Sequence, residues 1–551
     1  MKQFLQHPDN LTQPEWWRGA VVYQIYPRSY QDSNDDGIGD LNGIIERLPY
    51  IAKLGVDAVW ISPFFTSPMK DFGYDVSDYC NVDPMFGTLA DFKRLVEVAH
   101  QLDLRVIIDQ VLSHTADAHP WFVESSSSRD NPKADWYVWA NAKEDGSPPN
   151  NWLSIFIGSA WQWNARREQY YMHNFLTSQP DLNLHNPEVR AMMFDVLRFW
   201  LDIGVDGFRL DTVNFYLHDP QLRNNPARGR PVANDSGVVP TNPYSWQTHL
   251  YDKSQPENLV LLQEMRAVLD EYPGVTTVGE IGEEDAFELQ AAYTAGGDKL
   301  HTAYTFDLLN EQKSPEYLRQ TFAKFEQMGA DSWACWSLGN HDTVRLASRW
   351  NSDPRALRAY LSMLLSVRGS PCLYQGEELG LTDGVLTFEQ LRDPYGISMW
   401  PEAGGRDGCR TPMAWQSALP NAGFSAAAPW LPVMAEHAAM AVDVQEADAG
   451  SLLHYYRTWL HQRRKLKLLR DGEFDLLPSH PQVLAYIRRD KASGKSLLCV
   501  LNLSDVQTAY VLPAGIQAGS LADLPQTANE ELLDKSTLSL QPWDSLFAWL
   551  N

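Results

Sequence analysis

Short apolar runs alternate with amphipathic segments through most of the chain. We predict that eight of these runs form β-strands, because several are apolar throughout, as strands buried on both faces are. Each run ends in polar or charged residues, where chemistry would be expected. The predicted strands cover residues 20–26, 56–61, 105–111, 205–210, 275–279, 302–306, 333–338 and 371–374.

The amphipathic segments between these runs carry apolar residues at helical spacing. Alternation of strand and helix predicts parallel strands joined by right-handed crossovers. Eight repeats favour a closed (β/α)8 barrel over an open doubly wound sheet. No GxGxxG follows the first strand, which weakens a dinucleotide-binding alternative. The clearest predicted helices cover residues 41–54, 89–102, 187–203, 257–271 and 450–469.

Two crossovers are too long to be simple loops. Residues 114–185, rich in Trp, Pro, Asn and Gly, are interpreted as a subdomain inserted after the third strand, and 216–255 as a rim loop. Short apolar strands after residue 472 predict a C-terminal antiparallel β-sandwich. The predicted domains are a catalytic barrel (1–113 and 186–470), the inserted subdomain (114–185) and the sandwich (471–551).

Composition narrows the class of protein. The 551 residues include 70 acidic and 45 basic side chains, a formal net charge of −25, which argues against nucleic acid or an anionic membrane as partner. Five cysteines without a CxxC pair indicate a reduced compartment. The first 17 residues lack the apolar core of a signal peptide, and no apolar run could cross a membrane. We therefore expect a cytoplasmic protein; its oligomeric state stays open.

Three strand ends carry a lone carboxylate, in GFRLD (Asp211), VGE (Glu280) and GNHD (Asp342). A parallel barrel gathers its strand ends on one face, so these groups should converge. A pair of carboxyl groups is the usual catalytic arrangement in enzymes that cleave glycosidic bonds. Arg209 lies on the same side of its strand as Asp211 and should lower the pKa of that carboxyl. The apolar run before Glu280 should raise the pKa of Glu280.

Several ordered motifs give the chain a family resemblance. QIYPRSYQDSNDDGIGDLNGI, FGYDVSDY, DGFRLDTVN, NHD, YQGEELG and GCRTPM occur in this order. Together they resemble the α-glucosidase and oligo-1,6-glucosidase branch of the α-amylase family, glycoside hydrolase family 13. The resemblance implies that Asp211 is the nucleophile, Glu280 the general acid/base and Asp342 a stabiliser of the transition state.

The resemblance also implies a closed substrate pocket. Asp71 in DFGYD and Arg410 in GCRTP match a pair that blocks the pocket and holds the non-reducing end of the substrate. Tyr74 would stack beneath the bound glucose. Phe156 and Phe175, in the inserted subdomain, are expected either on the pocket wall or in the core of the subdomain.

Three further positions bear on substrate recognition. His114 and His341 would donate hydrogen bonds to sugar hydroxyls. Ser113 occupies the position where the family usually has Asn. In amylases this Asn often binds a calcium ion, so the sequence does not predict that the same group is bound here. Thr212, directly after the nucleophile, is typical of enzymes that cut α-1,4 bonds, whereas Val is associated with α-1,6 bonds.

The segment DSNDDGIGD predicts a structural cation site. It places oxygen ligands at alternate positions, resembles the first half of a calcium loop and lacks the distal Glu. Related α-glucosidases hold Ca²⁺ or Mg²⁺ here; a turn held only by side chain-to-backbone hydrogen bonds is the alternative. The predicted ligands are Asp32, Asn34, Asp36, the Ile38 carbonyl and Asp40.

These observations predict a retaining, exo-acting α-glucosidase that hydrolyses short α-1,4-linked gluco-oligosaccharides and can transfer glucose to another hydroxyl. An oligo-1,6-glucosidase, a trehalose-6-phosphate hydrolase and a sucrose isomerase remain alternatives. Arg223, Arg228 and Arg230 in the rim loop leave a phosphorylated substrate open. A non-catalytic transporter subunit would lack the carboxylates and carry a membrane anchor, which this sequence does not indicate.

Overall fold

The fold centres on a barrel of eight parallel strands. The computed structural model describes residues 15–231, 238–329, 331–527, 530–533 and 535–551, so the expectation about a signal peptide lies largely outside them. The strand order is β11-β10-β9-β5-β2-β1-β13-β12, and a parallel bridge between Ala303 and Ala334 joins the two outer strands. The (β/α)8 prediction is confirmed. The barrel strands are β1 (Val22–Ile25), β2 (Ala58–Ile61), β5 (Arg105–Gln110), β9 (Gly207–Leu210), β10 (Thr276–Ile281), β11 (Thr302–Thr305), β12 (Cys335–Ser337) and β13 (Ser370–Tyr374).

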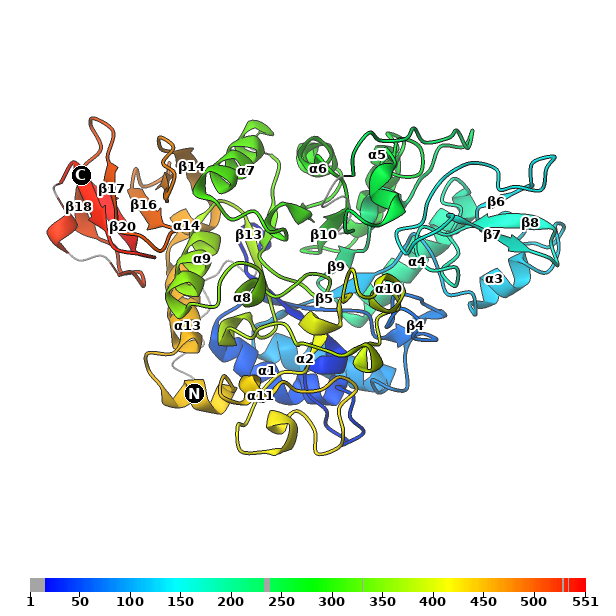
Figure 1. The fold of residues 1–551 in the computed structure, drawn as a ribbon, viewed down its shortest axis with the longest axis horizontal. Coiled ribbons are helices and arrows are strands. Elements are labelled where there is room, and N and C mark those ends of the chain that lie inside the picture. The colour runs from blue at the N-terminus through cyan, green and yellow to red at the C-terminus, as the bar shows by residue number, and fades with distance from the viewer. Residues whose placement is uncertain (1–14, 232–237, 330, 528–529, 534) are drawn as a thin grey trace.

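Helices surround the barrel (Figure 1). Their ends follow local chemistry: Asp40 caps the first by accepting a bond from Gly43 N–H, and Gly55 ends it with φ +105°, a conformation that glycine adopts without strain. None of the helices in the described ranges is long and apolar enough to cross a membrane. The surrounding helices are α1 (Leu41–Leu54), α2 (Leu89–Gln101), α4 (Pro187–Ile203), α5 (Asn258–Leu269), α6 (Ala286–Thr294), α7 (Pro315–Gln327), α8 (Leu346–Arg349), α9 (Pro354–Ser366), α13 (Leu452–Lys465) and the short α14 (Lys467–Asp471).

Alternate residues of each barrel strand face opposite sides. Val59 of β2 and Ile108 of β5 pack outward in the cluster that the helices cover. Ala58 and Ile107, one position earlier on the same strands, belong to the cluster inside the barrel. Successive side chains of a strand point to opposite faces, so the residue two positions further toward the carboxyl end also points into the barrel. On β2 this position holds Trp60, and on β5 it holds Asp109, a charged residue of the site described below.

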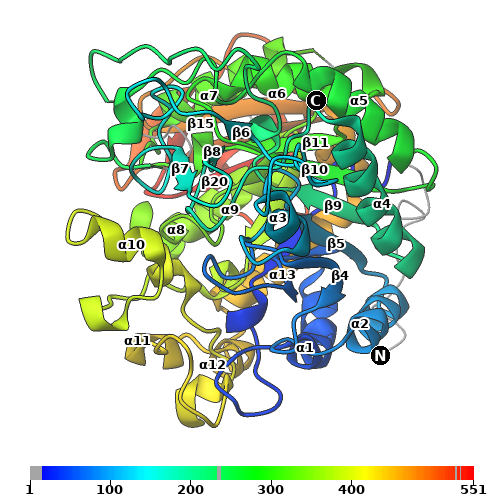
Figure 2. The ribbon, with the colours of Figure 1, turned by 90° about the vertical axis from the view of Figure 1, so that its right-hand side faces the viewer.

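Four excursions leave the barrel at the carboxyl ends of its strands. The two predicted from sequence, after β5 and β9, are present, and those after β2 and after β13 were not predicted. The inserted subdomain lies at the right of Figure 1 and faces the viewer in Figure 2. The excursions contain β3 (Phe65–Thr66) and β4 (Asp78–Val82) after β2; α3 (Pro120–Ser125), β6 (Trp139–Ala140), β7 (Trp161–Asn164) and β8 (Gln169–Met172) after β5; and α10 (Pro394–Met399), α11 (Ala435–Ala438) and α12 (Val442–Ala447) after β13.

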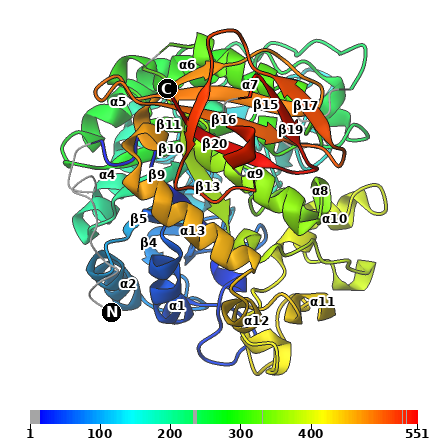
Figure 3. The same cartoon turned by 90° about the vertical axis from the view of Figure 1, so that its left-hand side faces the viewer.

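The C-terminal strands form two antiparallel sheets beside α9 and α13 (Figure 3). The larger sheet buries both faces, because Leu498 and Val500 pack against the smaller sheet while Phe547 packs against Trp459 of α13. This confirms a separate β domain after the barrel. Its strands are β14 (Glu473–Leu476), β15 (Val483–Arg489), β16 (Ser496–Asn502), β18 (Ala518–Leu521) and β20 (Ser545–Leu550), with β17 (Thr508–Val511) and β19 (Thr537–Leu540) in the smaller sheet.

Candidate active site

Four polar side chains meet inside the barrel at the carboxyl ends of neighbouring strands. Asp109 and Arg209 are register partners on β5 and β9. Glu280 and Tyr304 are partners on β10 and β11. Each lies two residues after another inward position, so strand periodicity alone turns all four toward the barrel axis. Their side chains are almost completely buried, which makes every hydrogen bond among them electrostatically strong.

Arg209 is shared by three carboxylates. Its Nη1 lies 2.7 Å from Asp211 Oδ1 and 2.8 Å from Asp109 Oδ1, and its Nη2 lies 2.6 Å from Glu280 Oε2. The expected pairing with Asp211 is therefore present, but it is not exclusive. The neighbouring strands β5 and β10 bring their own carboxylates to the same guanidinium, which offers five N–H donors in a fixed plane.

The pKa values of Asp211 and Glu280 are both raised to about 7 by burial, with Arg209 acting in the opposite direction. Arg209 lowers the pKa of Asp211, as expected, but desolvation outweighs this pairing, so the expectation that Arg209 by itself keeps Asp211 ionised is wrong. Each carboxylate also raises the pKa of its neighbours in this cluster. Two such groups lose their protons in two linked steps, so one of them carries a proton while the other is ionised near neutral pH.

The surroundings of Glu280 are polar, contrary to the apolar setting that the sequence suggested. Tyr304 Oη donates to Glu280 Oε1 at 2.9 Å, and the Thr212 backbone N–H donates to Glu280 Oε2 at 3.1 Å. Thr212 has φ 39° and ψ 51°, a strained conformation for a β-branched residue. The raised pKa of Glu280 thus comes from burial and neighbouring charge.

Asp342 follows β12 and differs from the other two carboxylates. Burial alone would raise its pKa, but positive charge that includes Arg410 and Arg406 holds the pKa of Asp342 well below its ordinary value. Arg410 Nη2 lies 2.9 Å from Oδ1, and the His341 Nε2 lies 3.2 Å from Oδ2. Asp342 is therefore an anion near neutral pH, fixed in place before any substrate arrives.

The partner of Asp71 is Arg406, and the expected contact with Arg410 is wrong. Arg406 Nη2 lies 2.7 Å from Asp71 Oδ1, whereas Arg410 is completely buried and bonds to Asp342 and the His341 carbonyl. The two arginines are only four residues apart in the chain. The path of the excursion after β13 decides which of them reaches Asp71, and sequence spacing does not show this.

The two predicted histidines lie at different depths. His114 Nδ1 is 2.9 Å from Ser113 Oγ, its Nε2 is 3.2 Å from Gln179 Nε2, and burial lowers its pKa to about 4. His341 is buried beneath Asp342, and its ring stacks on Tyr74 with centroids 5.4 Å apart. Both rings are neutral near pH 7, and only His114 reaches the pocket surface.

These groups open into one pocket with a cavity volume of about 520 Å³. Phe156 and Phe175 line it, as one expectation had it; both are half-buried and pack with Ile155 and with Phe215 of the segment after β9, outside the subdomain's own apolar cluster. Arg209, His341 and Arg410 lie behind the surface and act through the residues that they contact. The predicted residues on the pocket surface are Asp71, Tyr74, His114, Phe156, Phe175, Asp211, Thr212, Glu280 and Asp342.

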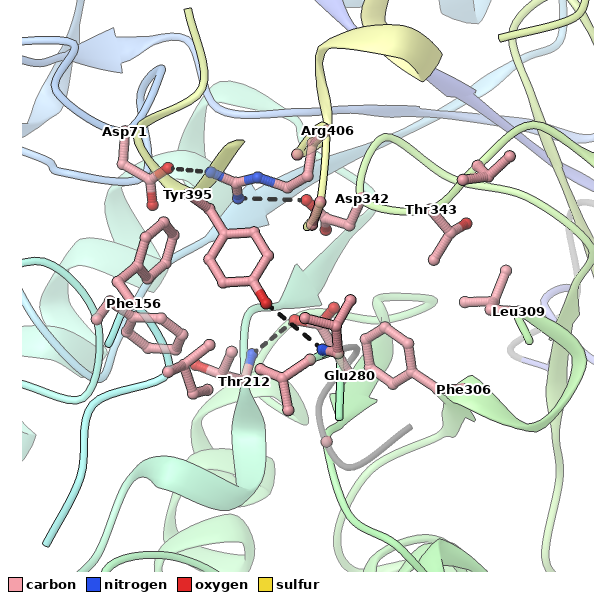
Figure 4. Close-up of a pocket in the computed structure, with 18 of the residues that line it drawn as sticks. Asp71, Phe156, Thr212, Glu280, Phe306, Leu309, Asp342, Thr343, Tyr395 and Arg406 are labelled. Atoms are coloured by element: carbon pink, nitrogen blue, oxygen red, sulfur yellow. Dashed lines mark hydrogen bonds and ion pairs between the residues drawn. The ribbon is translucent and has the colours of Figure 1, made fainter. Parts of the chain in front are cut away.

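Figure 4 shows how the two sides of the pocket oppose each other. Asp71, Arg406 and Asp342 form one side, and Thr212 and Glu280 lie across from them. Sequence reasoning missed several contributors. Tyr304 had a usable signal, because it lies at an inward position near the end of a predicted strand. Gln179, Tyr395 and Arg406 lie on excursions, where no periodicity assigns a direction. The residues missed from sequence are Asp109, Gln179, Tyr304, Tyr395 and Arg406.

The predicted cation loop is closed by its own backbone. Asp32 Oδ1 accepts bonds from Asn34 N and Asp35 N, and Asp32 Oδ2 accepts one from Gly37 N at 2.7 Å. Asp40 caps α1 and bonds to Ser33. Within the described ranges, no group of three or more acidic, His or Cys side chains is placed to hold a metal ion. The oxygen-only donor set suits Ca²⁺ or Mg²⁺, and cation binding stays a prediction.

Comparison with known proteins places the chain in a family. Residues 24–472 match the family model for the alpha amylase catalytic domain. The chain is 55% identical to a probable alpha-glucosidase of Rhizobium meliloti over 91% of both chains. It is 35% identical to an oligo-1,6-glucosidase of Parageobacillus thermoglucosidasius over 96% of this chain and 98% of that one. The chain belongs to the α-amylase family, glycoside hydrolase family 13, and is a glycoside hydrolase.

Solved structures agree with this assignment. The structure of an alpha-glucosyl transfer enzyme, XgtA, superposes with a TM-score of 0.93 at 51% identity, covering 97% of this chain and 99% of the other. The trehalulose synthase MutB from Pseudomonas mesoacidophila MX-45 superposes with a TM-score of 0.88 at 32% identity, over 97% and 99%. The named relatives therefore include glucosidases, an alpha-glucosyl transfer enzyme and a trehalulose synthase on the same fold.

Proposed function

We propose that the protein is a retaining, exo-acting α-glucosidase that releases terminal α-1,4-linked glucose from disaccharides and short oligosaccharides. The observation that carries the proposal is the pair Asp211 and Glu280, held on the two terminal nitrogens of Arg209. The pair lies in a pocket whose opposite side carries the Asp71–Arg406 ion pair. Retaining enzymes need two carboxyl groups close together across the scissile bond.

In the proposed reaction, the ionised Asp211 attacks the anomeric carbon while the protonated Glu280 gives its proton to the leaving glycosidic oxygen. The bond to the aglycone breaks, and a covalent glucosyl ester forms on Asp211. Glu280, now ionised, takes a proton from water, whose oxygen attacks the same carbon and frees Asp211. Two inversions at one carbon leave the product with the α configuration of the substrate.

Asp342 would stabilise the positive charge that develops on the sugar ring. Its pKa is held low, so the charge is present throughout the cycle. A preorganised anion in a buried site stabilises a cationic transition state more strongly than water does. The reaction also needs one ionised and one protonated carboxyl group at the same time. Asp211 and Glu280 meet this need, because both have a raised pKa and together hold one proton near neutral pH.

Linkage preference is proposed from Thr212. Its hydroxyl lies 3.3 Å from Asp211 Oδ2 and 3.3 Å from Ser113 Oγ, next to the anomeric carbon that Asp211 would attack. The family association of Thr with α-1,4 bonds supports maltose-type substrates. The relatives named oligo-1,6-glucosidase keep α-1,6 hydrolysis as the main alternative, and the trehalulose synthases keep sucrose rearrangement as another.

A phosphorylated substrate finds less support. Arg223 pairs with Asp219 at 2.8 Å, and Arg228 pairs with Glu284 at 2.5 Å. Two of the three rim-loop arginines that could bind a phosphate therefore already have carboxylate partners. Arg349 lines the pocket but bonds to main-chain carbonyls such as that of Asn310. Trehalose 6-phosphate would have to compete with these contacts.

Transfer of glucose to an alcohol is proposed as a side reaction. The covalent intermediate can be attacked by any hydroxyl that displaces water. Phe306, Leu309 and Val344 give part of the pocket wall an apolar surface, beside the polar Asn310 and Thr343. An apolar surface binds fewer waters than a polar one. We also propose a structural Ca²⁺ or Mg²⁺ at the loop around Asp32, remote from this chemistry.

The test compares wild-type protein with Asp211→Asn on maltose, isomaltose, sucrose and trehalose 6-phosphate, with the anomer read by NMR. We expect α-glucose from maltose and a loss of at least ~10³-fold in the variant. Asp195→Asn is the matched control, since Asp195 is 67% exposed on α4. Release of β-glucose, or an active Asp211→Asn protein, would refute the mechanism; preference for another sugar would refute the linkage assignment.

A further inference from the structure

Ser113 occupies the position where the family usually has Asn, and it lies directly behind the substrate pocket. It follows β5, is buried, and is absent from the residues that line the pocket. Its Oγ lies 2.9 Å from His114 Nδ1 and 3.3 Å from Thr212 Oγ1. The Thr212 hydroxyl in turn lies 3.3 Å from Asp211 Oδ2. One serine hydroxyl therefore connects a histidine of the pocket with the residue that contacts the proposed nucleophile.

The orientation of the Gln179 amide group is set by two partners other than His114. Gln179 Oε1 accepts a bond from the Leu176 backbone N–H at 2.9 Å, and Gln179 Nε2 donates to Asp71 Oδ2 at 3.0 Å. The second hydrogen of Nε2 is left for His114 Nε2, which lies 3.2 Å away. Because the amide nitrogen can only donate, this ring nitrogen of His114 is the acceptor.

The proton of the His114 ring is therefore assigned to Nδ1. Burial lowers the pKa of His114 to about 4, so the ring is neutral near pH 7 and carries one proton. His114 Nδ1 donates this proton to Ser113 Oγ, which leaves the Ser113 hydroxyl proton for Thr212 Oγ1. The Tyr74 carbonyl lies 3.1 Å from His114 Nε2 and would be its partner only in the other tautomer. In that tautomer the Nε2 proton would oppose the Gln179 amide.

The hydrogen bonds of this network all run in one direction. A carboxylate is a stronger acceptor than a hydroxyl, so Thr212 donates to Asp211 Oδ2 and accepts from Ser113. Both hydroxyl contacts are 3.3 Å, long for O–H···O bonds, and hydrogen bonds of active sites often shorten when substrate binds. The other oxygen of Asp211 accepts from Arg209 Nη1 at 2.7 Å. We call the side chains that lead to Asp211 the donor relay: Gln179, His114, Ser113 and Thr212.

We propose that Ser113 is a positioning residue for the nucleophile: it holds the Thr212 hydroxyl toward Asp211 Oδ2 and so keeps that oxygen directed at the anomeric carbon. The inference rests on the proposed function of Asp211. Because Gln179 also donates to Asp71, the donor relay joins two residues on the surface of the pocket through side chains that lie behind it. Ser113 itself touches no substrate and acts only through Thr212.

Several titratable groups surround Asp211 on its own strand and on the elements packed against it. Burial raises the pKa of Asp211, and Arg209 lowers it. Asp109 of β5 and Asp342 after β12 raise it further, and Glu280 of β10 shares Arg209 with it. A donor stabilises the ionised carboxyl, so loss of the donor relay should raise the pKa of Asp211. The charge of Asp211 also raises the pKa values of three nearby tyrosines: Tyr74, Tyr79 and Tyr216.

The experiment measures kcat and KM for maltose between pH 4 and 8 in wild-type protein, Ser113→Ala, Thr212→Val and the double variant. Ser113→Ala should lower kcat about threefold to tenfold with little change in KM. It should also move the acidic limb of kcat/KM to higher pH by roughly half a unit, because Asp211 must be ionised to attack. Thr212→Val should move this limb in the same direction. In the double variant Ser113→Ala should add no further shift, because the donor relay is already broken.

Ser332→Ala is the matched control, since Ser332 is buried before β12, at the end of the barrel away from the pocket, and its hydroxyl bonds to the Met328 carbonyl at 3.4 Å. It should leave the acidic limb in place. Ser113→Thr keeps a hydroxyl and should stay close to the wild type. If Ser113→Ala does not fold, Thr212→Val tests the donor relay at its next step.

Two results would overturn the inference and leave the proposed function standing. One is an acidic limb that neither Ser113→Ala nor Thr212→Val moves. The other is a double variant in which the two shifts add in full, because Ser113 would then act independently of Thr212. If the wild type releases no glucose from maltose at any pH, the proposed function is wrong and the inference is wrong with it.

Discussion

Tyr304 donates its phenolic proton to Oε1 of Glu280 at 2.9 Å, from the strand directly beside the one that carries Glu280. The same oxygen of Tyr304 accepts bonds from Arg209 Nε and Nη2 at 3.2 and 2.7 Å. Tyr304 thus connects the proposed general acid to the arginine that organises the carboxylates. It fixes Glu280 without touching the nucleophile.

We expect Tyr304→Phe to lower kcat by about tenfold to a hundredfold, because a buried carboxyl group loses a hydrogen bond donor. A donor to a carboxylate stabilises its charged form, so its removal should raise the pKa of Glu280. The alkaline limb of the kcat/KM profile should therefore move to higher pH. Steady-state rates between pH 5 and 9 provide the measurement.

Tyr510→Phe is the control for this substitution, since Tyr510 is a buried tyrosine whose hydroxyl bonds to the Pro478 carbonyl in the C-terminal domain. It should leave the profile in place. If Tyr304→Phe shifts the acidic limb and leaves the alkaline limb unchanged, Tyr304 acts on another group and the assignment to Glu280 is wrong.

Asp211→Asn should abolish activity and stabilise the fold above neutral pH. The pKa of Asp211 is about 7 in the folded protein, above its ordinary value of 3.8. The folded state therefore binds more protons than the unfolded state between these values, and stability falls as pH rises through that window. Asparagine removes this cost, so the Tm of the variant should exceed that of the wild type by a few degrees at pH 8.

The gain should shrink as pH falls toward 4, because the carboxyl is protonated in the folded state and pH 4 lies close to its unfolded pKa of 3.8. Calorimetric scans at pH 4, 6 and 8 measure the difference. Asp195→Asn, at an exposed position on α4, should show no such trend. If the variant is less stable than the wild type at pH 8, the prediction is wrong. The ion pair between Arg209 and Asp211 would then stabilise the fold by more than the burial of the Asp211 charge destabilises it.

Thr212→Val should raise the ratio of isomaltose to maltose hydrolysis by roughly tenfold. Valine keeps the shape of threonine but removes the hydroxyl that contacts Asp211 and Ser113. The backbone N–H that bonds to Glu280 is retained, so overall catalysis should survive. The ratio of kcat/KM values on the two disaccharides is the measurement.

Thr458→Val, on the exposed face of α13, is the matched control and should leave that ratio unchanged. An unchanged ratio in Thr212→Val would remove Thr212 as the source of linkage preference.

The loop around Asp32 should affect stability without affecting chemistry. None of its residues lines the pocket, so a chelator should leave kcat/KM on maltose unchanged. Asp32→Ala should lower Tm, because three backbone N–H groups lose their acceptor. A rise in Tm when Ca²⁺ or Mg²⁺ is added to chelated wild-type protein, absent in Asp32→Ala, would support the proposed cation. No rise would favour the self-closed turn.

Local pattern predicted the architecture well. All eight barrel strands overlap their predicted ranges, and α1 and α4 match them at both ends. The spacing of apolar residues distinguishes a strand from a helix within a short stretch of sequence. The same spacing shows which face of each element is buried. The excursion after β13, residues 375–451, was not predicted because its short helices have no repeating apolar face. The motif residues Asp211, Glu280 and Asp342 were found because they end strands whose carboxyl ends must meet.

The sequence by itself determined the barrel, the C-terminal sheets and the three carboxylates, since each follows from periodicity and from the shared direction of parallel strands. Only the tertiary structure decided the partners. Arg406 reaches Asp71 across 335 positions of sequence, and Gln179 reaches Asp71 across 108. Such contacts depend on strand register and on the paths of the excursions, whose sequences show no regular spacing of apolar residues. The raised pKa values have the same origin, because the burial that causes them belongs to the assembled barrel and not to any one segment.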